Sequence, residues 1–95
     1  MSTQSHGHDL SPYEALWALG AAITSYEKNG HAIGEGAKRR VYIAEISHKF
    51  DVAGCSYVEF DYPAWRYVYT GEEKYLNLLY ALASKYKIEF GKFDA

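Results

Sequence analysis

The residues best suited to chemistry are scattered along this chain, and each group falls short of a complete site. His6, His8 and Asp9 carry ligand atoms for zinc or nickel, but no second pair of ligands follows at a suitable distance. Cys55 and His48 have the types of a thiol nucleophile and its base, yet no third residue is evident to orient the base. The sequence therefore predicts no metal site, no cofactor and no enzymatic activity.

A second group of residues has the composition of an anion site. Residues 30–40 form a glycine-rich stretch that ends in Lys38, Arg39 and Arg40. The stretch lacks the Gly-Lys-Ser/Thr sequence of a nucleotide-binding P-loop, and a helix rather than a strand is predicted before it. A glycine-rich turn at a helix N-terminus with adjacent cations suits a phosphate or another anion. Nucleic-acid or nucleotide binding through this basic turn is therefore the alternative function.

The feature that most favours a function is the aromatic block over residues 56–70, within a chain that has ten tyrosines. Tyrosine combines a large apolar area with a polar tip and few rotatable bonds, which suits recognition as well as partial burial. A domain this small cannot bury every aromatic side chain of the block, and exposed Tyr, Trp and Arg dominate the energetics of protein interfaces. The predicted protein-binding residues are Tyr57, Glu59, Asp61, Tyr62, Trp65, Arg66, Tyr67 and Tyr69.

Composition narrows the class of protein. The chain has 95 residues, a net charge of −2 and a single cysteine. Its length is that of one domain, its near-neutral charge argues against a general nucleic-acid binder, and its lone thiol fits a reducing cytoplasm. No run of 18 apolar residues is present, so we expect no membrane span, and the opening residues lack the pattern of a signal peptide.

The order of elements is predicted from capping signals and periodicity. Ser11, Pro12 and Glu14 form a capping box that begins a helix over residues 12–28, and its apolar middle predicts a central position in the fold. A second helix is expected over about residues 35–50. A second capping box at residues 70–73 begins a third helix that ends near Lys85 or Tyr86.

The aromatic block itself alternates between apolar and polar residues, which is typical of strands. The alternation predicts a hairpin of two strands with its turn at Pro63 and Ala64. A competing interpretation makes residues 63–69 a short helix that Pro63 begins. The tail over residues 87–93 alternates too and is expected to add a short edge strand.

The predicted fold is thus a small single α+β domain over residues 11–95, in the order α-α-β-β-α with a short C-terminal strand, after a flexible tail over residues 1–10. The alternative is an all-α bundle in which residues 54–69 form one or two short helices.

We expect a non-enzymatic protein-interaction module whose partner is a host protein or a second copy of the chain. In size, charge and aromatic content the chain resembles small phage or mobile-element proteins that block a host enzyme by binding it. An anti-CRISPR protein that binds a CRISPR effector is one example of this type. The resemblance is one of type, since no motif carries it.

Overall fold

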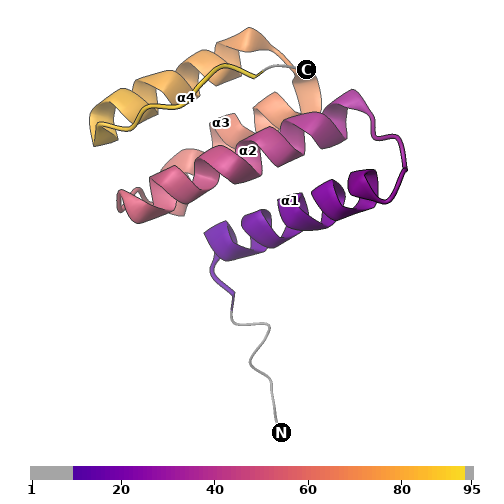
Figure 1. Ribbon diagram of the computed structural model, residues 1–95. Coiled ribbons are helices and arrows are strands. Elements are labelled where there is room, and N and C mark those ends of the chain that lie inside the picture. Colours follow the sequence, from indigo (N-terminus) through magenta and orange to yellow (C-terminus); the bar gives the residue numbers. More distant parts are fainter. Residues whose placement is uncertain (1–9, 94–95) are drawn as a thin grey trace, which may run out of the picture.

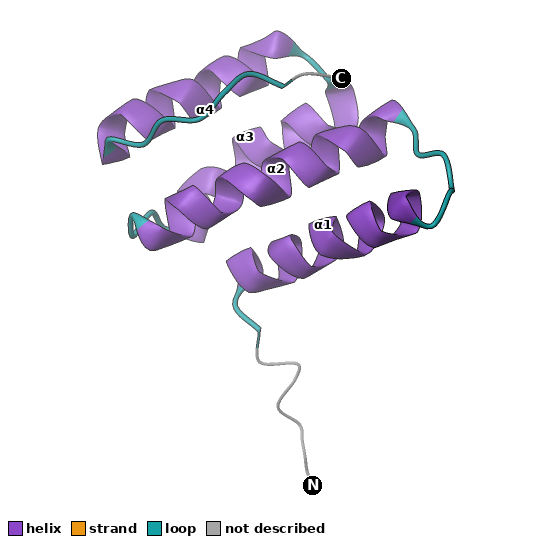
Figure 2. Ribbon diagram, in the orientation of Figure 1, coloured by secondary structure: helices purple, strands orange, loops and turns teal. Residues whose placement is uncertain are grey.

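The computed structural model describes residues 10–93, which form four helices and an extended C-terminal segment (Figure 1). The helices are α1 (Pro12–Lys28), α2 (Glu35–Val52), α3 (Tyr57–Thr70) and α4 (Glu73–Tyr86). This part of the chain contains no strand (Figure 2), so the α+β prediction is wrong and the all-helical alternative holds. The predicted histidine cluster at His6 and His8, and all of the predicted tail except Leu10, lie outside the described residues.

The capping box that begins α1 is confirmed. The Ser11 side chain accepts a 3.1 Å hydrogen bond from the Glu14 amide, and the Ser11 amide donates a 2.8 Å bond to Glu14 Oε1. Contrary to the prediction, α1 lies at the edge of the molecule and packs mainly against α2 (Figure 1). Gly20 allows this close approach, since a Cβ at Gly20 would lie 2.4 Å from the Cβ of Ala44.

The central helix is α2, which contacts both α1 and α3. Its fully buried residues include Ile43 and Phe50, and Phe50 meets Phe60 of α3 with ring centroids 5.0 Å apart. Apolar residues from all four helices complete this core, which also takes in Leu16 of α1 and Leu79 of α4. The described helices all lack the combination of length and hydropathy that crossing a bilayer requires.

The aromatic block forms one continuous helix, α3, so both the hairpin and the short helix beginning at Pro63 are wrong. The helix begins after Ser56, which has extended backbone angles, and ends at Gly71, whose φ of 69° is left-handed. The buried residues of the block recur at helical spacing, so the block has a helical period beside its apparent alternation; they are Phe60, Pro63, Ala64, Tyr67 and Val68. Pro63 lies buried inside the helix, where it packs into the core instead of making a turn.

Helix α4 begins two residues later than the predicted capping box implies. Thr70 is the last residue of α3 rather than the N-cap of the next helix. Its side-chain oxygen accepts a 3.1 Å hydrogen bond from the Glu72 amide, while Glu72 takes the N-cap position without a side-chain cap of its own. The predicted end of the helix is confirmed at Tyr86.

The C-terminal segment, residues 87–93, is extended but pairs with no strand, so the predicted edge strand is wrong. It runs back beside α4 (Figure 1) and is held by side chains. Phe90 stacks on Tyr80 with ring centroids 5.0 Å apart, and the Tyr42 hydroxyl donates a 2.6 Å hydrogen bond to the Gly91 carbonyl. Lys49 Nζ donates a 2.7 Å bond to the Glu89 carbonyl.

Candidate protein-binding surface

The outer face of α3 carries a row of four large apolar side chains, three of which are exposed. Val58, Tyr62 and Tyr69 are 83%, 60% and 66% exposed, and Trp65 between them is half-buried. These four residues, which we call the α3 seam, follow one another at intervals of four, three and four. Such spacing places side chains in one line on a helix and is the spacing of helix–helix contact surfaces.

The tryptophan of the seam is fixed in place by its own helix. Trp65 Nε1 donates a 3.0 Å hydrogen bond to the Tyr57 hydroxyl two turns earlier. Tyr57 in turn packs edge-on against Tyr13 of α1, with ring centroids 5.0 Å apart. Tyr57 therefore supports the seam from beside it, and Trp65 is held before any partner arrives. A side chain that is already ordered loses little entropy on binding.

An arginine from α2 covers one end of the seam. The Arg40 guanidinium lies 5.5 Å from the Trp65 ring centroid and 5.6 Å from that of Tyr69, in cation–π contact with both. The two rings stack on each other at 5.8 Å. Arg40 belongs to the predicted anion set, but it contacts Trp65 and Tyr69 of the predicted protein-binding set.

Arg66 lies along the α4 flank of the seam. Its Nε and Nη2 atoms each lie 3.4 Å from the Tyr75 hydroxyl, which accepts both hydrogen bonds. Arg66 thereby lowers the pKa of Tyr75. Tyr62 meets the same Tyr75 ring edge-on at 6.0 Å. The positions of Tyr62 and Arg66 are thus set by one buried tyrosine of α4.

The two carboxylates of the predicted set, Glu59 and Asp61, differ in their contacts. Glu59 Oε1 accepts a 2.7 Å hydrogen bond from Lys85 Nζ, and Glu59 Oε2 accepts a 2.5 Å bond from the Tyr86 hydroxyl. These two donors hold the pKa of Glu59 below its usual value, and the Glu59 carboxylate raises the pKa of Tyr86 to about 12. Asp61 is exposed one turn before Trp65, on the flank of the seam that faces away from α4. Both carboxylates border the first half of the seam.

Tyr67 does not belong to this surface. It is only 5% exposed and lies within the hydrophobic core. Its ring meets Tyr42 at 6.3 Å and Phe93 of the C-terminal segment at 6.3 Å, both edge-on. Burial raises the pKa of Tyr67, as expected for a phenol removed from water.

The three cations of the predicted anion site point to different partners. Arg39 Nε donates a 2.9 Å hydrogen bond to the Val68 carbonyl near the end of α3. Arg40 lies over the seam, and Lys38 Nζ is 3.8 Å from a Glu35 carboxylate oxygen. The structure therefore does not bring the three together around one anion.

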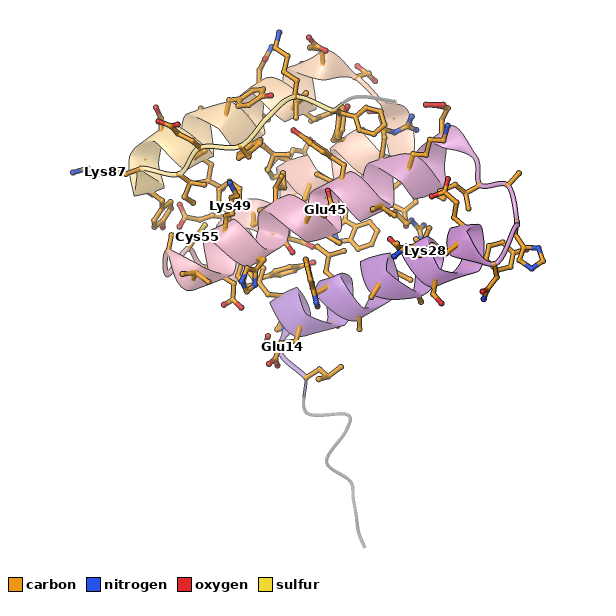
Figure 3. The ribbon with its side chains drawn as sticks, in the orientation of Figure 1. Glu14, Lys28, Glu45, Lys49, Cys55 and Lys87 are labelled. Carbon is orange, nitrogen blue, oxygen red and sulfur yellow. The ribbon has the colours of Figure 1, made fainter. Side chains whose placement is uncertain are left out.

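The two candidate catalytic residues, Cys55 and His48, lie apart from the seam. Cys55 is buried in the turn between α2 and α3 (Figure 3), where its Sγ lies 3.5 Å from the Ser56 carbonyl. The His48 ring packs on Trp17 of α1 with centroids 5.6 Å apart. Within residues 10–93, histidine, cysteine and carboxylate side chains form no group that could hold a metal ion.

Two residues of the surface are absent from the predicted protein-binding set. Val58 is not among the predicted protein-binding residues, although it is the most exposed large apolar residue of the described chain. Its interval of four residues to Tyr62, continued through Trp65 and Tyr69, is a signal that the sequence contains. Arg40 belongs to the predicted anion site, and no sequence signal connects it with Trp65.

No protein-family model matches the chain, and neither curated proteins nor solved structures show a significant similarity to it.

Proposed function

We propose that this protein is a non-enzymatic protein-interaction module that binds another polypeptide through the α3 seam. The observation that supports the proposal most is the exposure of Val58, Tyr62 and Tyr69 at helical intervals that align them. Removing this apolar surface from water is favourable, so a polypeptide that covered the seam would form a stabilised complex. A helix or an apolar groove is the complementary shape for such a row.

The surroundings of the seam favour binding over chemistry. Trp65 and Tyr62 are held by Tyr57 and Tyr75, and Arg40 lies stacked on the rings. Aromatic and arginine side chains of this kind are the usual anchors of protein interfaces. Flanking charges contribute specificity and association rate more than affinity. The narrower prediction, that the protein is an inhibitor of a host defence protein, rests on size, charge and aromatic content and stays a prediction.

A capture experiment tests the proposal. Tagged wild-type protein and a Tyr62→Ser/Tyr69→Ser variant are incubated with a lysate of the source cells at physiological salt, and retained proteins are quantified. Tyr26→Ser is the matched control, because Tyr26 is 54% exposed but lies on α1, away from the seam. Circular dichroism checks that all three proteins keep their helical signal.

The expected result is a protein retained by the wild type and by Tyr26→Ser and lost with the seam variant. Equal retention by all three proteins would contradict the proposed surface. A salt titration separates the alternative function, since a phosphate contact weakens steeply with salt whereas an aromatic interface changes little. Retention of nucleic acid alone, lost at moderate salt, would replace the proposal with nucleic-acid binding.

A further inference from the structure

We infer that the α3 seam of one molecule packs against the α3 seam of a second copy, with the two helices antiparallel and related by a two-fold axis. The inference rests on the proposed function and names the partner of the same surface. Two observations carry it. The apolar spacing is self-complementary in the antiparallel direction, and so is the distribution of charge along the seam.

The spacing fixes a register. Intervals of four, three and four read the same in both directions, so an antiparallel copy can present its row in line with the first. Val58 then lies opposite Tyr69 of the second copy, and Tyr62 lies opposite its Trp65. Each layer pairs one residue from the first half of the seam with one from the second half, as layers of antiparallel coiled coils do. A two-fold interface requires this self-complementarity.

The charges beside the seam are divided between its two ends. Glu59 and Arg66 lie on the α4 flank, where Glu59 contacts Lys85 and Arg66 contacts Tyr75. Asp61 and Arg40 lie on the other flank, where Arg40 covers the Trp65 ring one turn beyond Asp61. Both carboxylates therefore border the first half of the seam, and both guanidinium groups border the second half.

This division selects the antiparallel arrangement. In an antiparallel pair, Asp61 faces Arg40 of the second copy on one flank. On the α4 flank, Arg66 faces the Glu59–Lys85 ion pair of the second copy, whose charges largely cancel, so the Asp61–Arg40 flank carries the selection. A parallel pair would instead place Asp61 against the Glu59–Lys85 ion pair and Arg40 against Arg66 of the second copy. That arrangement loses the attraction between Asp61 and Arg40 and adds repulsion between two guanidinium groups. Charge and apolar spacing thus favour the same geometry independently.

The contact is expected to be weak. The seam runs from Val58 to Tyr69 of α3, so it is about 17 Å long at 1.5 Å per residue. An interface of one short helix per copy belongs to the small end of the range for specific contacts, below roughly 1,200 Å². We therefore expect a monomer that dimerises over micromolar concentrations instead of a permanent dimer.

A charge-exchange experiment tests the inference by sedimentation velocity over a range of concentrations. Asp61→Lys alone places lysine against Arg40, and Arg40→Glu alone places glutamate against Asp61, so each variant should self-associate at least about tenfold more weakly than the wild type. An equimolar mixture of the two restores opposite charges at both contacts of that flank. The mixture should form a heterodimer clearly stronger than the self-association of either single variant, although Arg40→Glu also removes the cation–π contacts with Trp65 and Tyr69.

Recovery of association on mixing separates a lost contact from a damaged fold, because a misfolded variant would not regain association when a second variant is added.

A cross-linking experiment tests the direction of the helices. Val58→Cys mixed with Tyr69→Cys should form a disulfide-linked heterodimer under mild oxidation, whereas Val58→Cys alone should form little homodimer. Cys55 is buried and common to all the variants, and the wild type measures its background.

Three outcomes would overturn the inference: a wild type that stays monomeric throughout, variants whose mixture does not recover association, or Val58→Cys homodimers as the main cross-linked product. Failure here is distinguishable from failure of the proposed function. A monomeric wild type that still loses its captured partner on Tyr62→Ser/Tyr69→Ser would keep the seam as a protein-binding surface and remove only the second copy as its occupant.

Discussion

Trp65 Nε1 donates a 3.0 Å hydrogen bond to the hydroxyl of Tyr57, which lies eight residues earlier on the same helix. This bond reaches across two turns of α3 and fixes the edge of the indole, while Arg40 covers its face. The aromatic side chain at the middle of the proposed surface is therefore ordered within the monomer.

The hydrogen bond should be detectable as a coupling between its two residues. Trp65→Phe removes the donor, Tyr57→Phe removes the acceptor, and the double variant removes both. We expect a coupling free energy of about 0.5–1.5 kcal/mol, as is usual for a protein hydrogen bond. Urea unfolding of the four proteins measures it by a double-mutant cycle. Additive effects of the two substitutions would show that the bond contributes nothing in solution.

Two neighbouring tyrosines of α3 should behave oppositely when they are truncated. Tyr67→Ala should lower the free energy of unfolding by about 3–5 kcal/mol, because it opens a cavity in the core. Tyr69→Ala should cost less than about 1 kcal/mol, because Tyr69 is 66% exposed. Denaturant unfolding compares the two at equal concentration. Similar costs for both substitutions would contradict the orientation of α3.

Because α1 and α2 are in close contact at Gly20, replacing this glycine by alanine should destabilise the protein, although the same change usually stabilises a helix. Gly20→Ala in an exposed helix would stabilise by about 1 kcal/mol. Here the new Cβ would lie 2.4 Å from that of Ala44, so we expect a loss of about 1–3 kcal/mol from overpacking. The double variant Gly20→Ala/Ala44→Gly should recover part of this loss. A more stable Gly20→Ala single variant would mean that α1 packs elsewhere.

The ion pair between Glu59 and Lys85 should give the protein a particular pH dependence. The folded state holds the pKa of Glu59 below its ordinary 4.5, so ionised Glu59 stabilises the fold above pH 4.5. That contribution is lost as the pH falls below 4.5 and through the lower folded pKa. Urea unfolding of the wild type and Glu59→Gln should therefore differ at neutral pH and converge in acid. A difference independent of pH would rule out this role for Glu59.

The sequence predicts the elements that have local signals. The capping box at Ser11 and Glu14 and the end of α4 at Tyr86 were both predicted, because each depends on residues within a few positions. The aromatic block was predicted as a hairpin because its apolar residues satisfy two periods at once. Tertiary packing distinguishes the helix from the hairpin. Phe60 packs against Phe50 of α2, and Tyr67 packs against Phe93 of the C-terminal segment.

The candidate surface was predicted in part. Tyr62, Trp65 and Tyr69 follow from the expectation that a small core cannot bury every aromatic residue. The burial of Tyr67 could not be predicted without knowing which face of α3 meets the core. The contact of Arg40 with Trp65 depends on how α2 crosses α3, and it joins residues far apart in the sequence.

Hydroxyl-radical footprinting of the wild-type chain tests the central claim most directly, because it requires no knowledge of the partner. Modification of Tyr62 and Tyr69 is compared between dilute purified protein and the same protein in a concentrated lysate of its source, with Tyr26 as the internal reference. If the α3 seam binds protein, Tyr62 and Tyr69 should be protected severalfold in the lysate while Tyr26 is unchanged. Equal modification of all three tyrosines in both conditions would contradict the claim that the outer face of α3 is a binding surface.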